Sequence, residues 1–343
     1  MAAVESLARF EAAQATTAVA LFNRWQRGLP LLPRPFDALG AGSGLSGSQV
    51  RELLRDGVAR GQISRVGAVF GIGSGGAAML CAMRVPAAEL EAVAACVNSE
   101  PGVNHNYQRE HALNLWFVVT NTDPARLHAS VERIEQRCGR QALHLPMRRA
   151  YRIDLGFDLF DAHAPREPAQ AQALAQAVPV PAVLRPLAAR LERGLPLVER
   201  PWAALGEPLG LAEDEVIATL RSWLEQGTLR RLGVVLRHHE LGIAANAMTV
   251  FSLPRPEADV EVDAAGMRLA AQPGVTLCYR RESAHCWPYT LYCMVHGRER
   301  GAVQVLIDQA TQAAGLAAFP REVLFSTRRF KQTGSRYFAP EPQ

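Results

Sequence analysis

The sequence predicts an α+β protein built as a tandem duplication, in which each copy joins a winged helix-turn-helix to a ferredoxin-like βαββαβ domain. Three observations predict this. A shift of the 343-residue chain by 166 residues aligns Gly28–Phe70 with Gly194–Leu236 without a gap, and 18 of 43 positions are identical. A later pair of stretches, Pro101–Glu110 and Pro273–Glu282, shares six of ten residues. Within each copy, helical periodicity then gives way to a β-α-β-β-α-β order.

Each copy begins with three short helical segments followed by a strand, which is typical of a winged helix-turn-helix. In copy one, apolar residues recur at helical spacing over 15–27, and a short Pro-bounded segment covers 36–39. Ser46 is a suitable N-cap for a third helix, which Gly61 should end. Residues 63–70 then have the composition of a strand. In copy two the corresponding helices are expected at 183–193, 202–205 and 213–226.

The rest of each copy has the order of the split βαβ unit, which brings four strands into one antiparallel sheet with both helices on one face. In copy one we expect strands at 77–85, 103–108, 113–120 and 141–150, and helices at 87–99 and 124–138. In copy two we expect strands at 244–253, 275–281, 289–296 and 322–328, and helices at 257–271 and 299–314.

These elements predict four domains and a connection between the two copies. The connection is rich in Ala, Pro and Gln, a composition typical of linkers. The expected divisions are a winged-helix-like domain at 1–75, a ferredoxin-like domain at 76–160, the linker at 161–182, a second winged-helix-like domain at 183–242 and a second ferredoxin-like domain at 243–343.

Composition indicates a reduced, cytoplasmic protein. The net charge of +4 is too small to imply a polyanionic partner, and Lys331 is the one lysine in a chain with 37 basic residues. Anions must therefore be bound by Arg, which forks onto carboxylates. The six cysteines form no CxxC pair, so no zinc site is expected. The early acidic residues exclude a signal peptide, and no apolar run reaches the length of a membrane span.

A winged helix joined to a ferredoxin-like domain resembles the feast/famine (Lrp/AsnC-type) regulators, and this chain resembles two such subunits fused. That resemblance implies DNA binding, which needs positively charged recognition helices in both heads. Residues 45–60 carry a net charge of +1, but residues 211–226 carry −3. The charge of copy two therefore argues against DNA binding and favours winged-helix domains that serve packing or dimerisation.

Longer motifs resemble a more specific family, the siroheme decarboxylases, in the fused form associated with haem d1 biosynthesis. The motifs are HNYQRE…NLWF from 105, RHHELG…AANAM at 237–248, WPYTLY at 287–292 and FKQTGSRYF at 330–338. The resemblance implies removal of carbon dioxide from the acetate groups at C12 and C18 of siroheme, giving 12,18-didecarboxysiroheme. It also implies that no cofactor is used and that the iron arrives with the substrate.

The residues of the hairpins suit that chemistry. A flat macrocycle rimmed by carboxylates needs aromatic faces and Arg forks, and the methylene carbon left by carbon dioxide must take a proton, which a His can supply. We expect His105 and His111 to deliver protons or hold the reacting acetates; the alternative is a structural His at a strand end. The residues that the repeat makes equivalent, Tyr107 with Tyr279 and Arg109 with Arg281, are expected to bind rim carboxylates, with sheet packing as the alternative. Trp116 and Trp287 are expected in the wall of the pocket or the core.

The copies differ in ways that predict a single working centre. Copy two has Leu277 in place of His105, and its hairpin carries an insertion of four residues that contains His285. We therefore expect one site, formed mainly by the hairpin of copy one. His238 and His239 are further candidates for propionate binding, and His238 or His285 for an approach to the iron, although a plain turn is as good an interpretation; no protein metal ligand is assigned. Basic residues near the last strand of each copy are expected to contact the rim or to form a solvated tail: Arg148, Arg149, Arg328 and Lys331.

Three classes of function remain open at this point. They are a siroheme decarboxylase, an Lrp/AsnC-type regulator and a tetrapyrrole carrier without turnover. The expected partners are siroheme and either a second copy of the chain or homologous subunits, because regulator-like domains pair sheet to sheet.

Overall fold

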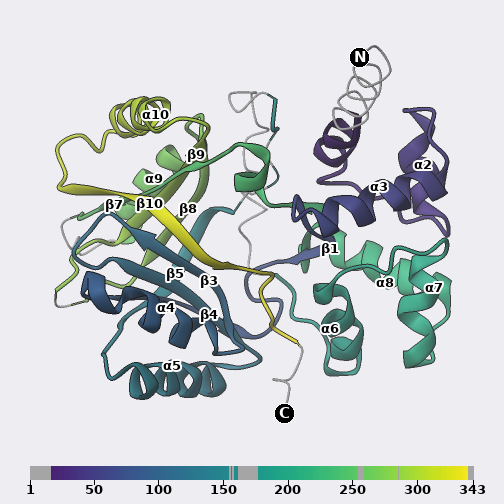
Figure 1. Cartoon of the computed structure of the whole chain (residues 1–343), viewed down its shortest axis with the longest axis horizontal. Helices are drawn as coiled ribbons and strands as arrows, with labels where there is room; N and C mark the ends of the chain where they lie inside the picture. The colour runs from purple at the N-terminus through teal and green to yellow at the C-terminus, as the bar shows by residue number, and fades with distance from the viewer. Residues whose placement is uncertain are drawn as a thin grey trace, which may run out of the picture. The chain divides into compact units, whose positions relative to one another are not determined.

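The computed structural model describes residues 17–153, 156, 158–160, 177–253, 259–284 and 286–338. The chain divides into two compact units, and each unit draws on both copies of the repeat (Figure 1). One unit comprises residues 1–74 and 177–241, and the other comprises residues 75–176 and 242–343. The winged-helix domains of the two copies therefore form one unit, and their ferredoxin-like domains form the other. The two are called here the winged-helix unit and the barrel unit.

The winged-helix unit contains the short helices predicted for both heads. In copy one, residues 17–24 are helical and are followed by α2 (Pro35–Ala41), α3 (Gly47–Ala59) and β1 (Ile63–Phe70). Copy two supplies η3 (Ala182–Leu184), α6 (Arg185–Arg193), α7 (Pro201–Gly206), η4 (Glu207–Leu209), α8 (Glu213–Glu225), β6 (Leu229–Leu236) and η5 (His238–Leu241).

Helix α3 begins and ends where the sequence predicts. The Ser46 hydroxyl accepts from the backbone N–H of Gln49, and the Gln49 side chain accepts from the backbone N–H of Ser46 at 2.8 Å. This reciprocal cap stabilises the helix by about 1 kcal/mol. After Arg60, Gly61 takes a left-handed conformation with φ of 75°, which ends the helix and confirms the prediction.

The two heads are joined by one antiparallel pair of strands, β1 and β6, with Gly67 opposite Gly233. Further backbone hydrogen bonds join the two copies. The Leu195 N–H donates to the Val66 carbonyl at 2.7 Å, and the Val234 N–H donates to the Trp25 carbonyl at 2.8 Å. A Cβ on Gly233 would lie 2.5 Å from the carbonyl oxygens of Trp25 and Gln26, closer than real contacts allow. Close backbone approach therefore explains the glycine repeated in SRVGAVF and RRLGVVL.

The predicted linker is shorter at its C-terminal end than the sequence suggested. Residues 161–176 lie outside the described part of the chain, but residues 177–182 belong to the winged-helix unit. Ala177 donates to the Ile72 carbonyl at 3.0 Å, and Val180 donates to the Ser74 carbonyl at 2.7 Å. Two backbone hydrogen bonds thus hold this segment against copy one, which an Ala/Pro composition could not reveal.

The barrel unit contains both βαββαβ domains. Copy one provides β2 (Ala77–Met83), η1 (Ala87–Glu89), α4 (Leu90–Asn98), β3 (Val103–Arg109), β4 (Leu115–Asn121), α5 (Pro124–Cys138) and β5 (Leu143–Ile153). Copy two provides β7 (Ala245–Phe251), α9 (Asp259–Ala270), β8 (Val275–Arg281), β9 (Leu291–Gly297), α10 (Arg300–Ala313) and β10 (Arg321–Gln332).

The two sheets close into one eight-stranded barrel in the order β10-β3-β4-β2-β5-β8-β9-β7. Closure depends on the last strand of each copy, because β5 pairs first with β2 and then with β8, and β10 pairs first with β7 and then with β3. These strands run to Ile153 and Gln332, beyond the predicted ends at 150 and 328. The extra length is stabilised by a partner strand from the other copy, which was not visible within either copy alone.

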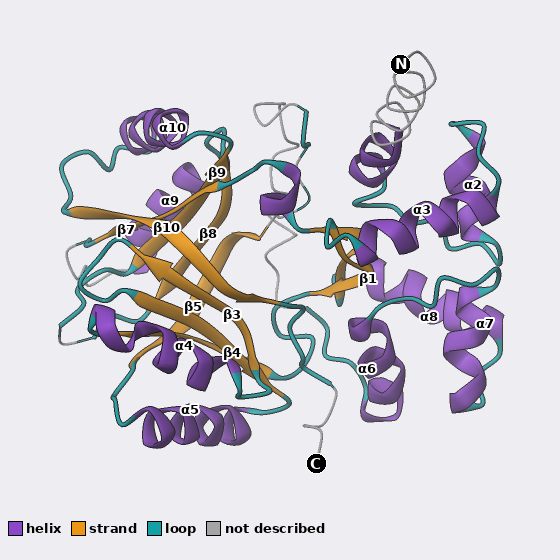
Figure 2. Ribbon diagram, viewed as in Figure 1, coloured by secondary structure: helices purple, strands orange, loops and turns teal. Residues whose placement is uncertain are grey.

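The four main helices cover the outside of the barrel (Figure 2). Helices α4 and α5 pack over copy one on a core that includes Val97, Phe117 and Ile134, while α9 and α10 pack over copy two. The opposite sheet faces turn inward and cover each other. The expectation that an exposed sheet face would drive pairing with a second chain is therefore wrong, because the duplicated partner already covers that face. Among the helices that the structure describes, none is both long and apolar enough to cross a membrane.

Candidate active site

Aromatic side chains from both copies fill the inside of the barrel. The interior cluster contains Trp116 of copy one and Trp287, Tyr279 and Tyr292 of copy two, and among the described residues none of its members comes from a helix. The Trp116 and Trp287 ring centroids lie 5.2 Å apart, and the Tyr279 and Tyr292 rings stack at 5.7 Å. Both Trp residues are 2% exposed, as expected for residues of the wall or core. The barrel interior therefore offers the flat apolar faces that the sequence predicts.

The polar atoms of this cluster are largely satisfied within it. The Trp287 indole donates to the Tyr292 hydroxyl at 2.7 Å, and that hydroxyl donates to the Tyr289 carbonyl at 3.3 Å. The Trp116 indole donates to the Leu113 carbonyl at 2.6 Å. Burial raises the pKa of Tyr292, so its phenol stays neutral. The rings are thus fixed in orientation rather than loosely packed.

Arg109 and Arg281 occupy equivalent places where the two sheets meet. Arg109 donates to the Leu324 carbonyl at 2.9 Å, and Arg281 donates to the Leu145 carbonyl at 2.6 Å. Each guanidinium also lies over a tyrosine, Arg281 at 4.6 Å from the Tyr279 ring. Both arginines are 6% exposed, and burial lowers the pKa of Arg109 to about 10. They therefore bridge the strands that close the barrel, a role that the sequence did not reveal; contact with a rim carboxylate stays a prediction.

His105 and Tyr107 lie on the inward face of β3. Asn106, between them, donates to the Ala94 carbonyl of α4, so its neighbours point to the opposite face of the sheet. The rings of His105 and Tyr107 are stacked with centroids 6.1 Å apart. Burial raises the pKa of Tyr107, and the nearby charges of Arg109 and Arg329 oppose the shift. The phenol is therefore neutral and can donate a hydrogen bond to a carboxylate.

His111 lies beyond the end of β3, in the turn before β4. Its Nδ1 accepts from the Leu113 N–H at 2.9 Å, so the neutral ring carries its proton on Nε2. The ring meets Trp287 edge-on with centroids 5.3 Å apart. His111 therefore adjoins the aromatic cluster, while His105 lies four residues before the end of the strand at Arg109. The structure brings both imidazoles to the barrel lining but not to the same point.

The basic residues predicted near the last strands contact other protein groups, and their contact with the rim of a substrate stays a prediction. Arg149 pairs with Asp263 of α9, and Arg328 pairs with Glu91 of α4, so both face the outer helices. Lys331 donates to the Asn98 carbonyl at the end of α4 at 2.8 Å. Arg148 is exposed and pairs with Glu282 at 2.8 Å. Strand alternation, which is uncertain where a strand leaves its own sheet, decided these directions.

Strand alternation also identifies a residue that the sequence-based list missed. Arg329 faces Tyr107 across the β10–β3 pair, and Gln332 faces His105. Arg329 donates to the Gln332 side chain at 3.1 Å. The sequence could not identify Arg329, because its direction depends on the register of β10 against β3.

The remaining candidates lie elsewhere. His238 and His239 belong to η5 in the winged-helix unit, where His238 is 8% exposed and His239 is largely exposed beside Glu240. His285 lies outside the described residues. The proposed approach of His238 or His285 to the substrate iron stays a prediction, and the part of the chain that the structure describes contains no cluster of metal-binding side chains.

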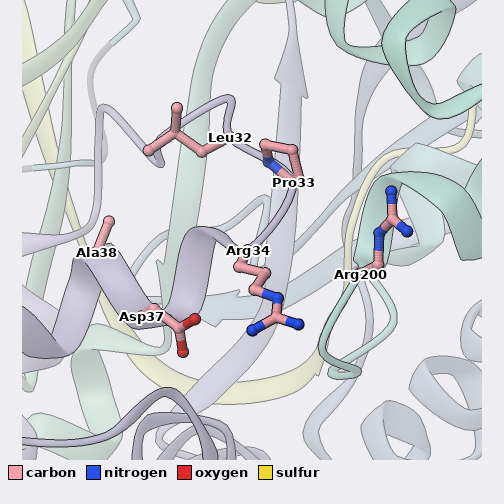
Figure 3. A pocket seen from close by; sticks show the side chains of 6 residues that line it. All are labelled: Leu32, Pro33, Arg34, Asp37, Ala38 and Arg200. Atoms are coloured by element: carbon pink, nitrogen blue, oxygen red, sulfur yellow. The ribbon is translucent and has the colours of Figure 1, made fainter.

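The winged-helix unit has a shallow hollow of about 470 Å³ (Figure 3). Arg34 and Arg200, which are equivalent in the repeat, line it together with Leu32 and Asp37. Glu199 pairs with Arg34 at 2.8 Å, and Glu213 pairs with Arg200. Among the described residues no aromatic ring lines this hollow, and its arginines are paired with acids, so it lacks the features expected of a tetrapyrrole site.

Comparison with known proteins agrees with the division of the chain into helix-turn-helix and ligand-binding-like parts. An AsnC-like ligand binding domain matches residues 74–152 and 240–331, and a siroheme decarboxylase NirDL-like HTH domain matches residues 185–230. The siroheme decarboxylase NirDL subunit of Paracoccus denitrificans (strain Pd 1222) is 42% identical over 92% of this chain and 95% of its own length. Shorter relatives from Stutzerimonas stutzeri, the siroheme decarboxylase NirL and NirD subunits, are 47% and 46% identical and match 44% and 41% of this chain.

Solved structures agree as well. A crystal structure of the siroheme decarboxylase NirDL is similar to this chain with a TM-score of 0.65 and 26% identity, covering 94% of both chains. A second crystal structure, of NirDL in co-complex with an iron-uroporphyrin III analogue, has a TM-score of 0.63 and 25% identity and covers 94% of this chain and 93% of that one.

Proposed function

This chain belongs to the siroheme decarboxylase family, and we propose that it removes the carboxyl groups of the C12 and C18 acetates of siroheme to give 12,18-didecarboxysiroheme. The reaction is non-oxidative and serves haem d1 or alternative haem biosynthesis. One observation carries the proposal: the barrel interior combines an aromatic cluster from both copies with a polar, inward-facing row on β3. An operator-binding function is disfavoured, because α8 begins with three acidic residues.

The reaction requires the protein to position the substrate and to supply a proton to the methylene carbon. In each step the bond between the methylene carbon and the carboxylate breaks, and carbon dioxide leaves. The electron pair stays on the methylene carbon, which accepts a proton and becomes a methyl group. An imidazole contributes roughly 10²–10⁴-fold by supplying that proton. His105 and His111 are the proposed donors, one for each acetate, because their positions along the hairpin differ.

We propose that no resident cofactor takes part and that the only iron is that of the substrate. The proposal is tested by conversion under anaerobic conditions after the protein has been treated with a chelator. Undiminished conversion supports it, whereas a requirement for added metal or a redox partner would contradict it. We also propose a cytoplasmic setting, which suits the thiols of Cys81, Cys278 and Cys293, all buried and unpaired in disulfides.

We propose that the assembly in which this chain acts is formed with homologous siroheme decarboxylase subunits or with a second copy. The named NirD, NirL, NirH and NirG relatives support related subunits as partners. Light scattering of the purified protein would distinguish these arrangements from a monomer. Co-purification with the homologous subunits would identify a mixed complex.

The decisive experiment is anaerobic incubation of the purified protein with siroheme, followed by mass spectrometry of the tetrapyrrole. A decarboxylase gives a product lighter by two carbon dioxide units. The double variant His105→Ala/His111→Ala should bind siroheme but should release almost no carbon dioxide from it. A Soret shift without any loss of mass in the wild type would instead identify a tetrapyrrole carrier.

A further inference from the structure

The two places where the sheets meet can be compared residue by residue. Residues 145–153 (LPMRRAYRI) and residues 324–332 (LFSTRRFKQ) correspond without a gap. The structure supports this correspondence, because Leu145 and Leu324 both belong to the interior cluster and both accept a hydrogen bond from an arginine of the other copy. Ala150 pairs with Tyr279 in β5–β8, and Arg329 pairs with Tyr107 in β10–β3. The comparison therefore makes Arg329 the counterpart of Ala150.

The side chain of Arg329 faces the barrel interior. Its neighbour Arg328 pairs with Glu91 of α4 and lies 4.8 Å from the ring of Phe330, and Phe330 packs against the core beneath the outer helices. Alternation along the strand places Arg329 on the opposite face. Its counterpart Ala150 packs against the interior cluster, which gives the same direction independently.

On the copy-one side, the inward row is polar. Arg329 bonds to Gln332, and these two residues face Tyr107 and His105 across the strand pair. Arg329, Gln332, His105 and Tyr107 are all partly accessible to solvent. A guanidinium, an amide, an imidazole and a phenol therefore converge at the edge of the barrel, and all of them can donate to a carboxylate.

On the copy-two side, the same positions are apolar except for one tyrosine. Ala150 and Leu277 replace Arg329 and His105 and pack against the interior cluster. Ile153 replaces Gln332. Tyr279 is retained but is 6% exposed. A ring carboxylate placed beside Ala150 and Leu277 would meet methyl groups and would lose hydration without the guanidinium and imidazole that the matching copy-one positions supply.

We propose that Arg329 and Gln332 hold a carboxylate of the iron tetrapyrrole beside His105, and that the absence of such an anchor in copy two fixes the macrocycle in one orientation. The inference rests on the proposed function and adds a positioning residue to it. The anchored group is a spectator carboxylate, not one that leaves. A guanidinium on the departing carboxylate would stabilise the ground state, whose charge disappears from that group as carbon dioxide forms, and would raise the barrier.

The test compares Arg329→Ala with Arg328→Ala, which removes the neighbouring arginine on the outer face. Siroheme is titrated anaerobically by its Soret band, and single-turnover reactions are stopped early so that singly decarboxylated products can be separated. Arg329→Ala should weaken siroheme binding about 10- to 100-fold, the effect of losing hydrogen bonds to a charged group. It should also yield both singly decarboxylated isomers where the wild type yields mainly one. Arg328→Ala should match the wild type, and Arg329→Lys should recover part of the affinity.

Binding by Arg329→Ala within twofold of the wild type, with one early isomer, would overturn the anchor. Should Arg329→Ala fail to fold, Arg329→Gln keeps the length and polarity of the side chain and is subject to the same criteria. A wild type that binds siroheme without converting it would refute the decarboxylase but leave the anchor to be judged on affinity. The two failures are therefore distinguishable.

Discussion

Removal of one imidazole at a time should stop the reaction after a single carbon dioxide. His105 lies four residues before Arg109 at the end of β3, and His111 lies in the turn beyond it. At a strand rise of about 3.3 Å per residue, His105 and the strand end are separated by roughly 13 Å. The two imidazoles therefore occupy different points of the hairpin, and we expect each to serve one acetate of a ring held in one orientation. His105→Ala should slow one decarboxylation and leave the other near its normal rate, and His111→Ala should do the reverse.

The expected decrease in the rate of the affected step follows from the loss of a positioned proton donor. A slowing of roughly 10²–10⁴-fold corresponds to about 3–5 kcal/mol in the barrier of the affected step. The assay is an anaerobic single-turnover time course in which each tetrapyrrole is resolved by liquid chromatography and mass spectrometry. His144→Ala is the control, because His144 is a strand residue that bonds to Glu135 of α5 at 3.0 Å on the outer side. The reasoning is refuted if each single variant slows both steps equally, or if neither accumulates a singly decarboxylated product.

Three further predictions concern the fold. Gly233→Ala should destabilise the protein by about 3 kcal/mol, because its Cβ would meet backbone oxygens at 2.5 Å, whereas Gly42→Ala should have little effect because nothing lies within 4 Å; urea unfolding of both variants checks this. Trp287→Ala should lower the urea midpoint by an amount equivalent to about 3–5 kcal/mol, and Trp287→Phe by less, while an unchanged midpoint for the alanine variant would contradict burial of the indole in a packed interior. Burial raises the pKa of Cys293 to about 12, so between pH 9 and 12 the folded state keeps a proton that the unfolded state loses. The free energy of unfolding should therefore fall as the pH rises above 9, and Cys293→Ala should reduce the slope in equilibrium unfolding measured across that range.

The sequence alone determined the duplication, the order of the elements and the aromatic character of the site. Gapless repetition of GLPL and of the glycine strands could arise only from a duplicated unit, and each element carried a local signal, such as the Ser46 cap of α3. Trp116 and Trp287 were expected in the wall of the pocket or in the core, and both are buried in the barrel interior. Local signals persist in the fold because capping, alternation and periodicity act over a few residues.

Only the tertiary structure decided how the copies combine and which way the basic side chains point. Arg328 and Arg329 are adjacent and alike in sequence, yet one pairs with Glu91 outside the barrel and the other faces Tyr107 inside it. Their directions depend on the register between β10 and β3, strands separated by about 200 residues of chain. Register is set by the packing of whole sheet faces against each other, and a single slip would exchange the two arginines. No pattern within β10 itself contains that information.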